Sequence, residues 1–351
     1  MLIFWLKFQE NFAIYLQIFY GLMIEKLYNI NRNIIWEDLM ENLIEVRGLV
    51  KKYKELTAVD NLDLDVKKGE ILGLLGPNGS GKSTTINCIL SLLKKDSGSV
   101  KIFGKEMSAD AYDIKKRIGV VFQDVAVYDE LTVYENIDYF CGLYIQDKSE
   151  RKELVKRALD LVSLNDFVKF KPKKLSGGLL RRLNIACGIA HKPEIIILDE
   201  PTVAVDPQSR NNILEGIKKL NEDGSTIIYT SHYMDEVDFL CDNIVIIDKG
   251  KVIAKGTSEQ LKDMIEMNEK ISFTAKELNE DVISQIKSLP HLMNFENKDG
   301  NVKLNFSHGD GYLMKLIKLL DENNINYSSL NVEKPSLNDV FLELTGKDLR
   351  D

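Results

Sequence analysis

Residues 76–83 constrain this chain more than any other stretch, because they fit the pattern G-x-x-x-x-G-K-[ST]. An apolar run at 71–75 precedes them, and apolar residues follow at helical spacing from Ile86. This order of strand, loop and helix is the context that a phosphate-binding loop needs. Glycines turn backbone N–H groups toward a phosphate, the helix N-terminus attracts it, and Lys82 adds a charge near the β- and γ-phosphates. A glycine-rich turn before a core helix is the alternative, and the full context favours nucleotide binding.

The predicted loop offers several groups that suit a phosphate or a metal ion. Among them, the Ser83 hydroxyl is suited to ligate Mg²⁺ beside the phosphates. The candidate binding residues are Gly76, Pro77, Asn78, Gly79, Ser80, Gly81, Lys82, Ser83 and Thr84.

Two adjacent carboxylates, Asp199 and Glu200, follow an apolar run at 195–198. Such a run between polar boundaries predicts a central parallel strand that is buried on both faces. Ligands bind at the carboxyl ends of such strands, and buried carboxylates are costly unless they serve a metal or a proton transfer. Asp199 therefore suits Mg²⁺ coordination, and Glu200 suits the orientation and deprotonation of an attacking water.

Two further motifs extend this site. His232 follows an apolar run at 226–230, so it should lie at the same sheet edge as the two acids, which favours a functional histidine over a solvated one. Ser176, Gly177 and Gly178 open a predicted helix that continues to residue 190. That helix start is a possible second anion-binding end, although a plain N-cap without a ligand is the simpler interpretation in isolation.

The charge balance limits the classes of partner. A net charge of −8 over 351 residues gives no basic surface and argues against nucleic acid as the main partner. The four cysteines form no C-x-x-C pair and predict reduced thiols in the core. No stretch in the body of the chain approaches the apolar length of a membrane span.

The first 39 residues differ from the rest. They are rich in aromatic and aliphatic side chains, but charges interrupt them, and the longest uncharged run, 11–24, is too short to span a bilayer. These residues have neither a basic leading region nor a small-residue cleavage site, which argues against a signal peptide. Met40 begins what resembles a natural start. We expect an artefactual or dispensable extension, and a helix lying on the membrane surface is the alternative.

From Lys270 the pattern changes to β-α-β-β-α-β, which predicts a small ferredoxin-like domain over 270–351 that carries no catalytic constellation. Tyr53, upstream of the phosphate loop, is ambiguous by residue type. An exposed surface tyrosine is the favoured interpretation of it alone, and stacking on a purine base is the alternative.

Together, the motifs of residues 43–265 resemble the ATP-binding cassette (ABC) ATPases in order and approximate spacing. The resemblance identifies 76–84 as the Walker A loop and Asp199 with Glu200 as the Walker B pair. It implies that Tyr53 stacks on adenine, which replaces the surface interpretation. The remaining roles that it implies are a signature motif over Leu175, Ser176, Gly177 and Gly178, a Q-loop glutamine at Gln123 that senses Mg²⁺ and the membrane partner, a D-loop aspartate at Asp206 and a switch histidine at His232.

The resemblance also implies an architecture and partners. The expected fold is a P-loop domain of ABC type over 40–265, with a mixed sheet core, an antiparallel β subdomain and a helical subdomain near 124–190. In this family, ATP joins two cassettes head to tail, so that the signature of one closes on the γ-phosphate held by the other. We therefore expect ATP and Mg²⁺, a second copy or a paralogue, and an integral-membrane permease on a separate chain. The expected location is cytoplasmic, peripheral on the inner face of the cell membrane.

The chain departs from the family pattern in two places. Leu179 stands where the signature usually has glutamine, and the D-loop at 203–206 has the sequence Val-Ala-Val-Asp. With Arg181 and Arg182, these features resemble the subgroup that serves export-type permeases in bacteria. A soluble cassette that acts on ribosomes or DNA is one alternative, which the single cassette and the acidic charge disfavour. A nucleotide switch that scarcely hydrolyses ATP is another, which Leu179 would permit.

Overall fold

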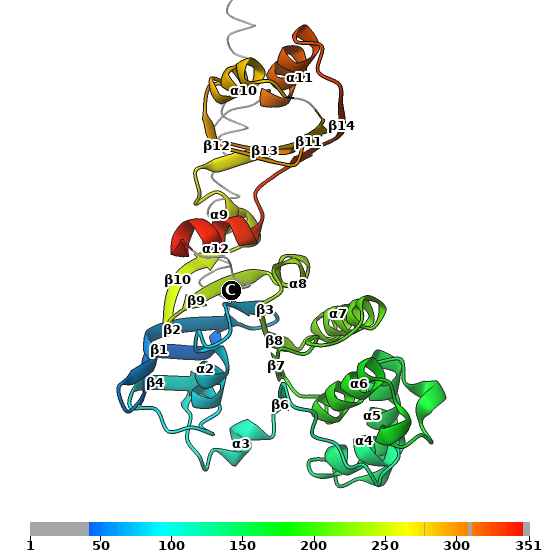
Figure 1. The fold of residues 1–351 in the computed structure, drawn as a ribbon. Helices are drawn as coiled ribbons and strands as arrows, with labels where there is room; N and C mark the ends of the chain where they lie inside the picture. Colours follow the sequence, from blue (N-terminus) through cyan, green and yellow to red (C-terminus); the bar gives the residue numbers. More distant parts are fainter. Residues whose placement is uncertain (1–41, 277, 308–310, 347–351) are drawn as a thin grey trace, which may run out of the picture.

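The computed structural model describes residues 42–276, 278–307 and 311–346 (Figure 1). The predicted extension at 1–39 and the last residues of the predicted C-terminal domain lie outside the described residues. No helix within the described ranges is long and apolar enough to cross a membrane.

A four-stranded antiparallel sheet of order β2-β1-β4-β5 forms the first layer. Its strands alternate buried and exposed side chains, as expected for a sheet with one face against a core. The first helix, α2, covers this sheet, and Ile86 and Ile89 of α2 belong to the same buried cluster as the sheet residues. The elements are β1 (Asn42–Tyr53), β2 (Leu56–Lys67), α2 (Lys82–Ile89), β4 (Ser97–Ile102) and β5 (Lys105–Glu106).

A six-stranded sheet of order β10-β9-β3-β8-β7-β6 lies at the centre of the cassette. Its strands pair in parallel, except that β10 pairs antiparallel to β9. Strands β3 and β7 are buried at every residue, as the continuous apolar runs predicted. The strands are β3 (Ile71–Leu75), β6 (Ile118–Val121), β7 (Ile195–Asp199), β8 (Thr226–Ser231), β9 (Asn243–Asp248) and β10 (Lys251–Gly256).

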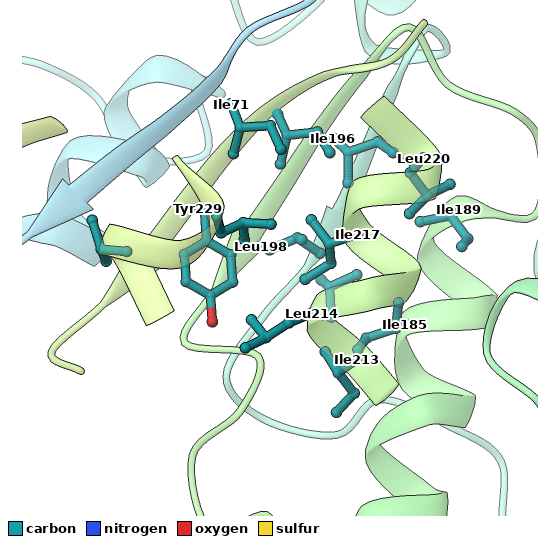
Figure 2. Packing of buried hydrophobic residues seen from close by; sticks show 14 of the residues in the cluster. Ile71, Ile185, Ile189, Ile196, Leu198, Ile213, Leu214, Ile217, Leu220 and Tyr229 are labelled. Carbon is teal, nitrogen blue, oxygen red and sulfur yellow. The ribbon is translucent and has the colours of Figure 1, made fainter. Parts of the chain in front are cut away.

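Helices surround this sheet and cover its second face. Figure 2 shows apolar side chains of α6 and α7 packed against residues of the sheet. In Figure 1, α4, α5 and α6 form a separate group in green, beyond the ends of β6 and β7. The helices are α3 (Tyr112–Lys115), α4 (Val133–Gly142), α5 (Lys148–Leu161), α6 (Gly177–Ile189), α7 (Pro207–Glu222), α8 (Met234–Leu240) and α9 (Ser258–Lys262), with short 3-10 turns at Asn165–Phe167 and Pro172–Lys174.

The C-terminal part follows the predicted β-α-β-β-α-β order, and its antiparallel sheet has the order β12-β13-β11-β14. It has a hydrophobic core of its own, to which Phe273, Val282, Phe306 and Leu316 contribute. The elements are β11 (Met267–Ala275), α10 (Glu280–Lys287), β12 (Leu292–Lys298), β13 (Asn301–Ser307), α11 (Tyr312–Glu322), β14 (Tyr327–Glu333) and α12 (Leu337–Thr345).

The last helix does not pack with this C-terminal core. Leu337, Val340 and Phe341 of α12 belong to the buried cluster of the cassette, together with Leu240 of α8 and Leu261 of α9. Figure 1 shows α12, in red, beside α9 and β10. The chain thus returns from the small domain to the cassette, so the two cores separate near residue 270 while α12 packs with the cassette core.

Candidate nucleotide site

The carboxyl ends of four parallel strands meet at one edge of the central sheet. In register, Leu75 at the end of β3 pairs with Ser231 of β8, and Asp199 at the end of β7 pairs with Thr230. The phosphate loop, the two acids and His232 follow these ends directly, as predicted from the apolar runs. Since parallel strands place all their carboxyl ends on the same side, the fold gathers groups that lie more than a hundred residues apart in sequence.

The phosphate loop is built by close backbone approach. A Cβ added to Gly76 would lie 2.2 Å from the carbonyl oxygen of Ile247 and 2.7 Å from Ser80 Oγ. Gly81 caps the N-terminus of α2 with a φ of 109°, where a Cβ would lie 2.5 Å from the Ala58 carbonyl oxygen. Glycine alone fits both positions without displacing backbone. The Ser80 hydroxyl is buried and has no hydrogen-bond partner among the described residues, so a phosphate oxygen could satisfy this polar group within the loop.

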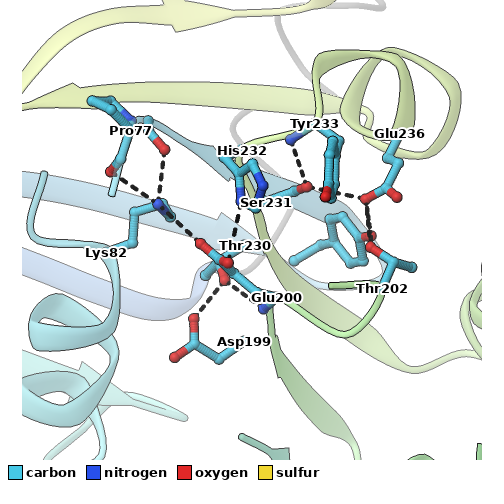
Figure 3. A network of polar contacts seen from close by, with 12 residues as sticks. Pro77, Lys82, Asp199, Glu200, Thr202, Thr230, Ser231, His232, Tyr233 and Glu236 are labelled. Atoms are coloured by element: carbon cyan, nitrogen blue, oxygen red, sulfur yellow. Dashed lines mark hydrogen bonds and ion pairs between the residues drawn. The ribbon is translucent and has the colours of Figure 1, made fainter. Parts of the chain in front are cut away.

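Lys82 is the centre of the polar contacts around this loop. The residue is 5% exposed, and its ammonium donates to the carbonyl oxygens of Gly76 and Pro77 at 2.7 and 3.1 Å. It also forms an ion pair with Glu200 Oε1 at 3.2 Å, and the second oxygen of that carboxylate lies 3.2 Å from His232 Nδ1 (Figure 3). Lys82, Glu200 and His232, predicted from three separate motifs, therefore form one contiguous chain of contacts.

Thr230 fixes both acids. Its hydroxyl donates to Asp199 Oδ1 at 2.6 Å and accepts from the Glu200 N–H at 2.9 Å (Figure 3). Glu200 has a φ of +47°, a left-handed conformation that costs a non-glycine residue of order 1–3 kcal/mol and persists only when its surroundings enforce it. No motif predicted a role for Thr230, although its place immediately before Ser231 and His232, opposite the acids in the neighbouring strand, is the available signal.

Glu236, on α8, anchors the segment that carries His232. Its buried Oε2 accepts from Tyr229, Thr202 and Ser231 at 2.7, 2.8 and 3.0 Å (Figure 3). The Ser231 hydroxyl in turn accepts from the Tyr233 N–H at 2.9 Å, which fixes the turn around His232. Burial raises the pKa of the Tyr229 hydroxyl well above its ordinary value, so it remains a hydrogen-bond donor. The sequence analysis missed this cluster because its members are spread over three elements.

The other predicted side chains of this region face outward. Ser83 and Gln123 are exposed and Thr84 is half-buried, while Tyr53 at the end of β1 is 45% exposed with Lys51 Nζ 5.2 Å from its ring centre. An exposed ring is free to stack on another planar group.

The signature residues lie on a different helix and meet different neighbours. Ser176 caps α6, and its hydroxyl accepts from the Leu179 N–H at 3.3 Å. Leu179 packs against the large buried cluster, so the residue in the usual glutamine position here contributes to the core. A Cβ on Gly178 would lie 2.4 Å from Ser209 Oγ and 3.1 Å from Asp206 Oδ2.

Gly178 of the predicted signature thus lies close to Asp206, the predicted D-loop aspartate. Asp206 caps α7 and accepts from the Ser209 N–H at 2.9 Å, a bond that holds the pKa of this carboxyl below its usual range. In Figure 1, α6 lies in the green helical group and α2 in the blue group, with β6, β7 and β8 between them. The two predicted anion-binding helix ends thus belong to separate parts of one chain.

Comparisons with known proteins agree with this fold. Residues 59–203 match a family described as ABC transporter, and residues 256–345 match the C-terminal domain of DrrA1-3-like ATP-binding proteins. The chain is 41% identical over 311 residues to the linearmycin resistance ATP-binding protein LnrL of Bacillus subtilis (strain 168), a match that covers 88% of this chain and 100% of LnrL. It is 40% identical over 225 residues to the daunorubicin/doxorubicin resistance ATP-binding protein DrrA of Streptomyces peucetius, covering 64% of this chain and 68% of that protein.

Solved structures with the same fold include two cassettes. One, described as an ATP-binding subunit of an ABC transporter, superposes with a TM-score of 0.58 at 26% identity and covers 63% of this chain and 92% of its own. Another is a dimeric ATP-binding cassette in a post-hydrolysis state bound to ADP and phosphate, with a TM-score of 0.56 at 32% identity, covering 61% of this chain and 98% of its own.

Proposed function

The chain belongs to the ATP-binding proteins of the ABC transporter family, and on that premise we propose that it powers export through an integral-membrane permease on another chain. As a member of that family it binds ATP and hydrolyses it. Two similar proteins are named for resistance to linearmycin and to daunorubicin and doxorubicin, which supports antibiotic-like compounds as the exported class. A nucleotide switch uncoupled from transport is not favoured, since the likeness to LnrL covers 88% of this chain.

Lys82 and Glu200 carry the proposed chemistry. Lys82 binds the β- and γ-phosphates. To reach the Lys82 ammonium, a phosphate oxygen must compete with the Glu200 carboxylate, which pairs with that ammonium at 3.2 Å. That competition releases Glu200 toward the γ-phosphate, where it takes a proton from the attacking water. The water oxygen bonds to phosphorus as the bond to the bridging oxygen of ADP breaks. Glu200 is already held at the sheet edge by Thr230, so little reorganisation is needed.

His232 orients this base. Its Nδ1 lies 3.2 Å from Glu200 Oε2, so a proton on Nδ1 makes the ring a donor to the carboxylate. We assign the same side chain a contact with the γ-phosphate when the cassette closes, and Tyr53 a stacking contact with adenine.

The donor groups suit Mg²⁺ as well. Ser83 offers a hydroxyl, Gln123 an amide oxygen and Asp199 a carboxylate, and oxygen ligands are those that this hard cation prefers. These three residues would hold the ion, which when bound neutralises charge on the phosphates. Thr230, by donating to Asp199 Oδ1, orients that carboxylate.

The site is completed by a second copy of the chain or a paralogue. The single observation that carries this is the position of the signature: Ser176 and Gly177 are exposed on α6, and a Cβ on Gly177 would meet nothing within 4 Å. An exposed helix start with free backbone N–H groups is an anion-binding end. We propose that Ser176, Gly177 and Gly178 close on the γ-phosphate of the partner, with Asp206 beside them at the contact between cassettes.

Mixing two inactive variants tests this arrangement. Lys82→Ala removes the phosphate contact, and Gly177→Asp places a negative charge on the signature, where the open space accommodates it. Each variant alone should lack turnover. Random pairing gives mixed dimers with one complete site, so the mixture should regain about a quarter of the wild-type rate. A mixture as inactive as its components would show that both motifs act within one chain.

Location and domain roles follow from the same proposal. We place the chain in the cytoplasm, against the inner face of the membrane, because a permease partner must reach it there. Residues 40–265 act as the motor domain, with the helical part near 124–190 and Gln123 facing the permease. The domain at 270–351 serves as an accessory unit.

A further inference from the structure

A buried arginine in the cassette donates its hydrogen bonds to backbone carbonyls. Arg181, on α6, is 4% exposed. All five N–H groups of a guanidinium are donors, and five backbone carbonyl oxygens receive them here. The acceptors are Pro201 at 2.7 Å from Nε, Phe122 and Gln123 at 3.0 and 2.6 Å from Nη1, and Asp199 and Glu200 at 3.3 and 2.9 Å from Nη2.

These carbonyls belong to the carboxyl ends of two strands and the loops that follow them, which carry predicted site residues. Phe122 and Gln123 form the exit from β6, and residues 199–201 form the exit from β7. Arg181 itself lies on α6, close behind the signature residues at its start. One side chain therefore ties together the segment of the predicted permease sensor, the segment of the two acids and the helix that presents the signature.

The bond to Glu200 has a particular consequence. Glu200 occupies a left-handed conformation at φ +47°. Its N–H is held by Thr230 and its carbonyl by Arg181, so the peptide groups on both sides of its Cα are fixed. Rotation of either peptide would redirect the carboxylate away from Lys82 and His232.

From this geometry we infer that Arg181 is a positioning residue for ATP hydrolysis, which locks the Gln123 segment, the Glu200 segment and the signature helix into one moving unit. The inference rests on the proposed roles of Glu200 and of the signature. It deepens them, because a displacement imposed at Gln123 then reaches both the general base and the signature together. Arg181 touches none of the phosphate-loop residues, so it should affect turnover and not ATP affinity.

Arg182 offers a matched control on the same helix. Its Nη1 contacts the carbonyl oxygens of Val162 and Ser163 at 3.3 and 3.4 Å, in a segment that carries no predicted site residue. Burial lowers the pKa of both guanidiniums. Arg181 is the more buried of the two, and the donors of Arg182 reach no predicted site segment.

The experiment compares Arg181→Lys and Arg182→Lys in the full chain. A lysine keeps the charge but replaces the fixed fork of donors by a single ammonium, which cannot reach five carbonyls at once. We expect Arg181→Lys to reduce kcat about 10–100-fold, within the range seen for lost positioning. Its ATP dissociation constant should stay within about twofold of wild type, and Arg182→Lys should match wild type in both. If Arg181→Lys does not accumulate as folded protein, Arg181→Gln replaces it and is judged by the same split between kcat and affinity.

A double variant identifies the route. Combined with Glu200→Gln, Arg181→Lys should cause a much smaller loss of turnover than it causes alone, because its effect through the Glu200 carboxylate has already been removed. A kcat within twofold of wild type, an equal loss of ATP affinity, or the same loss in Arg182→Lys would each overturn the inference. If Glu200→Gln alone kept its turnover, the proposed base would be wrong, and with it the route through which Arg181 acts. If Arg181→Lys had normal turnover while Glu200→Gln was inactive, the positioning role of Arg181 would be refuted and the assignment of Glu200 as the base would stand.

Discussion

The two helix starts that could bind a phosphate differ in how far one chain completes them. At α2, the loop surrounds Lys82, which is buried and pairs with the Glu200 carboxylate from the next part of the sheet edge. At α6, Ser176 caps the helix and Gly177 has open space around it. The first end lies among charged groups from several strands. The second end faces outward, and Leu179 behind it packs against the buried cluster.

This difference suits the two helix starts to different functions. A group buried among charges can change reactivity, because low exposure strengthens each electrostatic contact. An exposed helix start has a rigid backbone and no chemistry of its own, so its use depends on what another molecule presents to it. We therefore propose that the phosphate-loop end is the reactive half and that the signature end recognises a partner's nucleotide.

The largest expected effect comes from removing the proposed general base, Glu200. Glu200→Gln keeps the shape of the side chain but removes the base, and steady-state turnover should fall about 10²–10⁴-fold. ATP should still bind, because Lys82 and the loop glycines are unchanged. A phosphate-release assay with an ATP titration measures both quantities. An unchanged rate would refute the assignment of Glu200.

The next test compares the two ends by affinity. Lys82→Ala removes charge-assisted hydrogen bonds worth about 1.5–3 kcal/mol and should weaken ATP binding to the single chain about 10–100-fold. Ser176→Ala should leave that affinity unaltered, since its hydroxyl accepts only a local bond from Leu179 at 3.3 Å, yet it should slow turnover at concentrations where chains pair. Fluorescence titration of dilute protein with a labelled ATP analogue separates the two variants. Equal weakening in both would show that both ends contact the same nucleotide within one chain.

A third test uses the pH dependence of stability, which has opposite signs for a buried acid near the phosphate loop and a buried histidine after the signature helix. Burial raises the pKa of Glu70, at the start of β3, to about 7, and burial lowers that of His191, after α6, to about 4. Because the pKa of Glu70 rises from 4.5 to about 7 on folding, its contribution to stability falls as the pH rises through that range. Because the pKa of His191 falls from 6.5 to about 4, its contribution falls as the pH drops below 6.5.

Glu70→Gln should therefore raise the free energy of unfolding by up to about 3 kcal/mol at pH 8 and change it little at pH 4. Urea unfolding of the variant and the wild type at several pH values measures this. A stability difference that does not grow between pH 5 and pH 8 would contradict the shift at Glu70.

The smallest expected effect distinguishes two neighbouring glycines of the signature. Gly178→Ala places a Cβ 2.4 Å from Ser209 Oγ and should cost about 1–3 kcal/mol of stability by overpacking. Gly177→Ala meets nothing within 4 Å and should leave thermal unfolding unchanged while reducing turnover of paired chains. If both alanines destabilised the single chain alike, the signature would not have the open face assigned to it.

Much of the reactive half could be predicted from local sequence. The apolar runs before Gly76, Asp199 and His232 predicted buried parallel strands, and parallel strands bring their carboxyl ends together. The predicted β-α-β-β-α-β order at the C-terminus also matches the observed elements. These features depend on periodicity within short segments, which a single sequence carries.

Other features depend on contacts between distant segments. Thr230 acts through the register of β7 against β8, and α12 leaves its own small domain to pack on α8 and α9. Arg181 shares a face of α6 with Asn184 and Ile185, so a charge on a buried stripe was the available signal, but no local pattern identifies five carbonyls from two loops as its partners.

By itself, the sequence predicted which groups would carry the chemistry: the glycines and Lys82 of the phosphate loop, the two acids, His232 and the start of α6. Their residue types and the flanking apolar runs suffice, because strand and helix formation respond to local periodicity. Only the tertiary structure decided that Lys82, Glu200 and His232 form one line of contacts while Ser176 and Gly177 face outward. The physical reason is that burial and pairing depend on how strands align and on which helix face the core covers, and those quantities exist only once the whole cassette has folded.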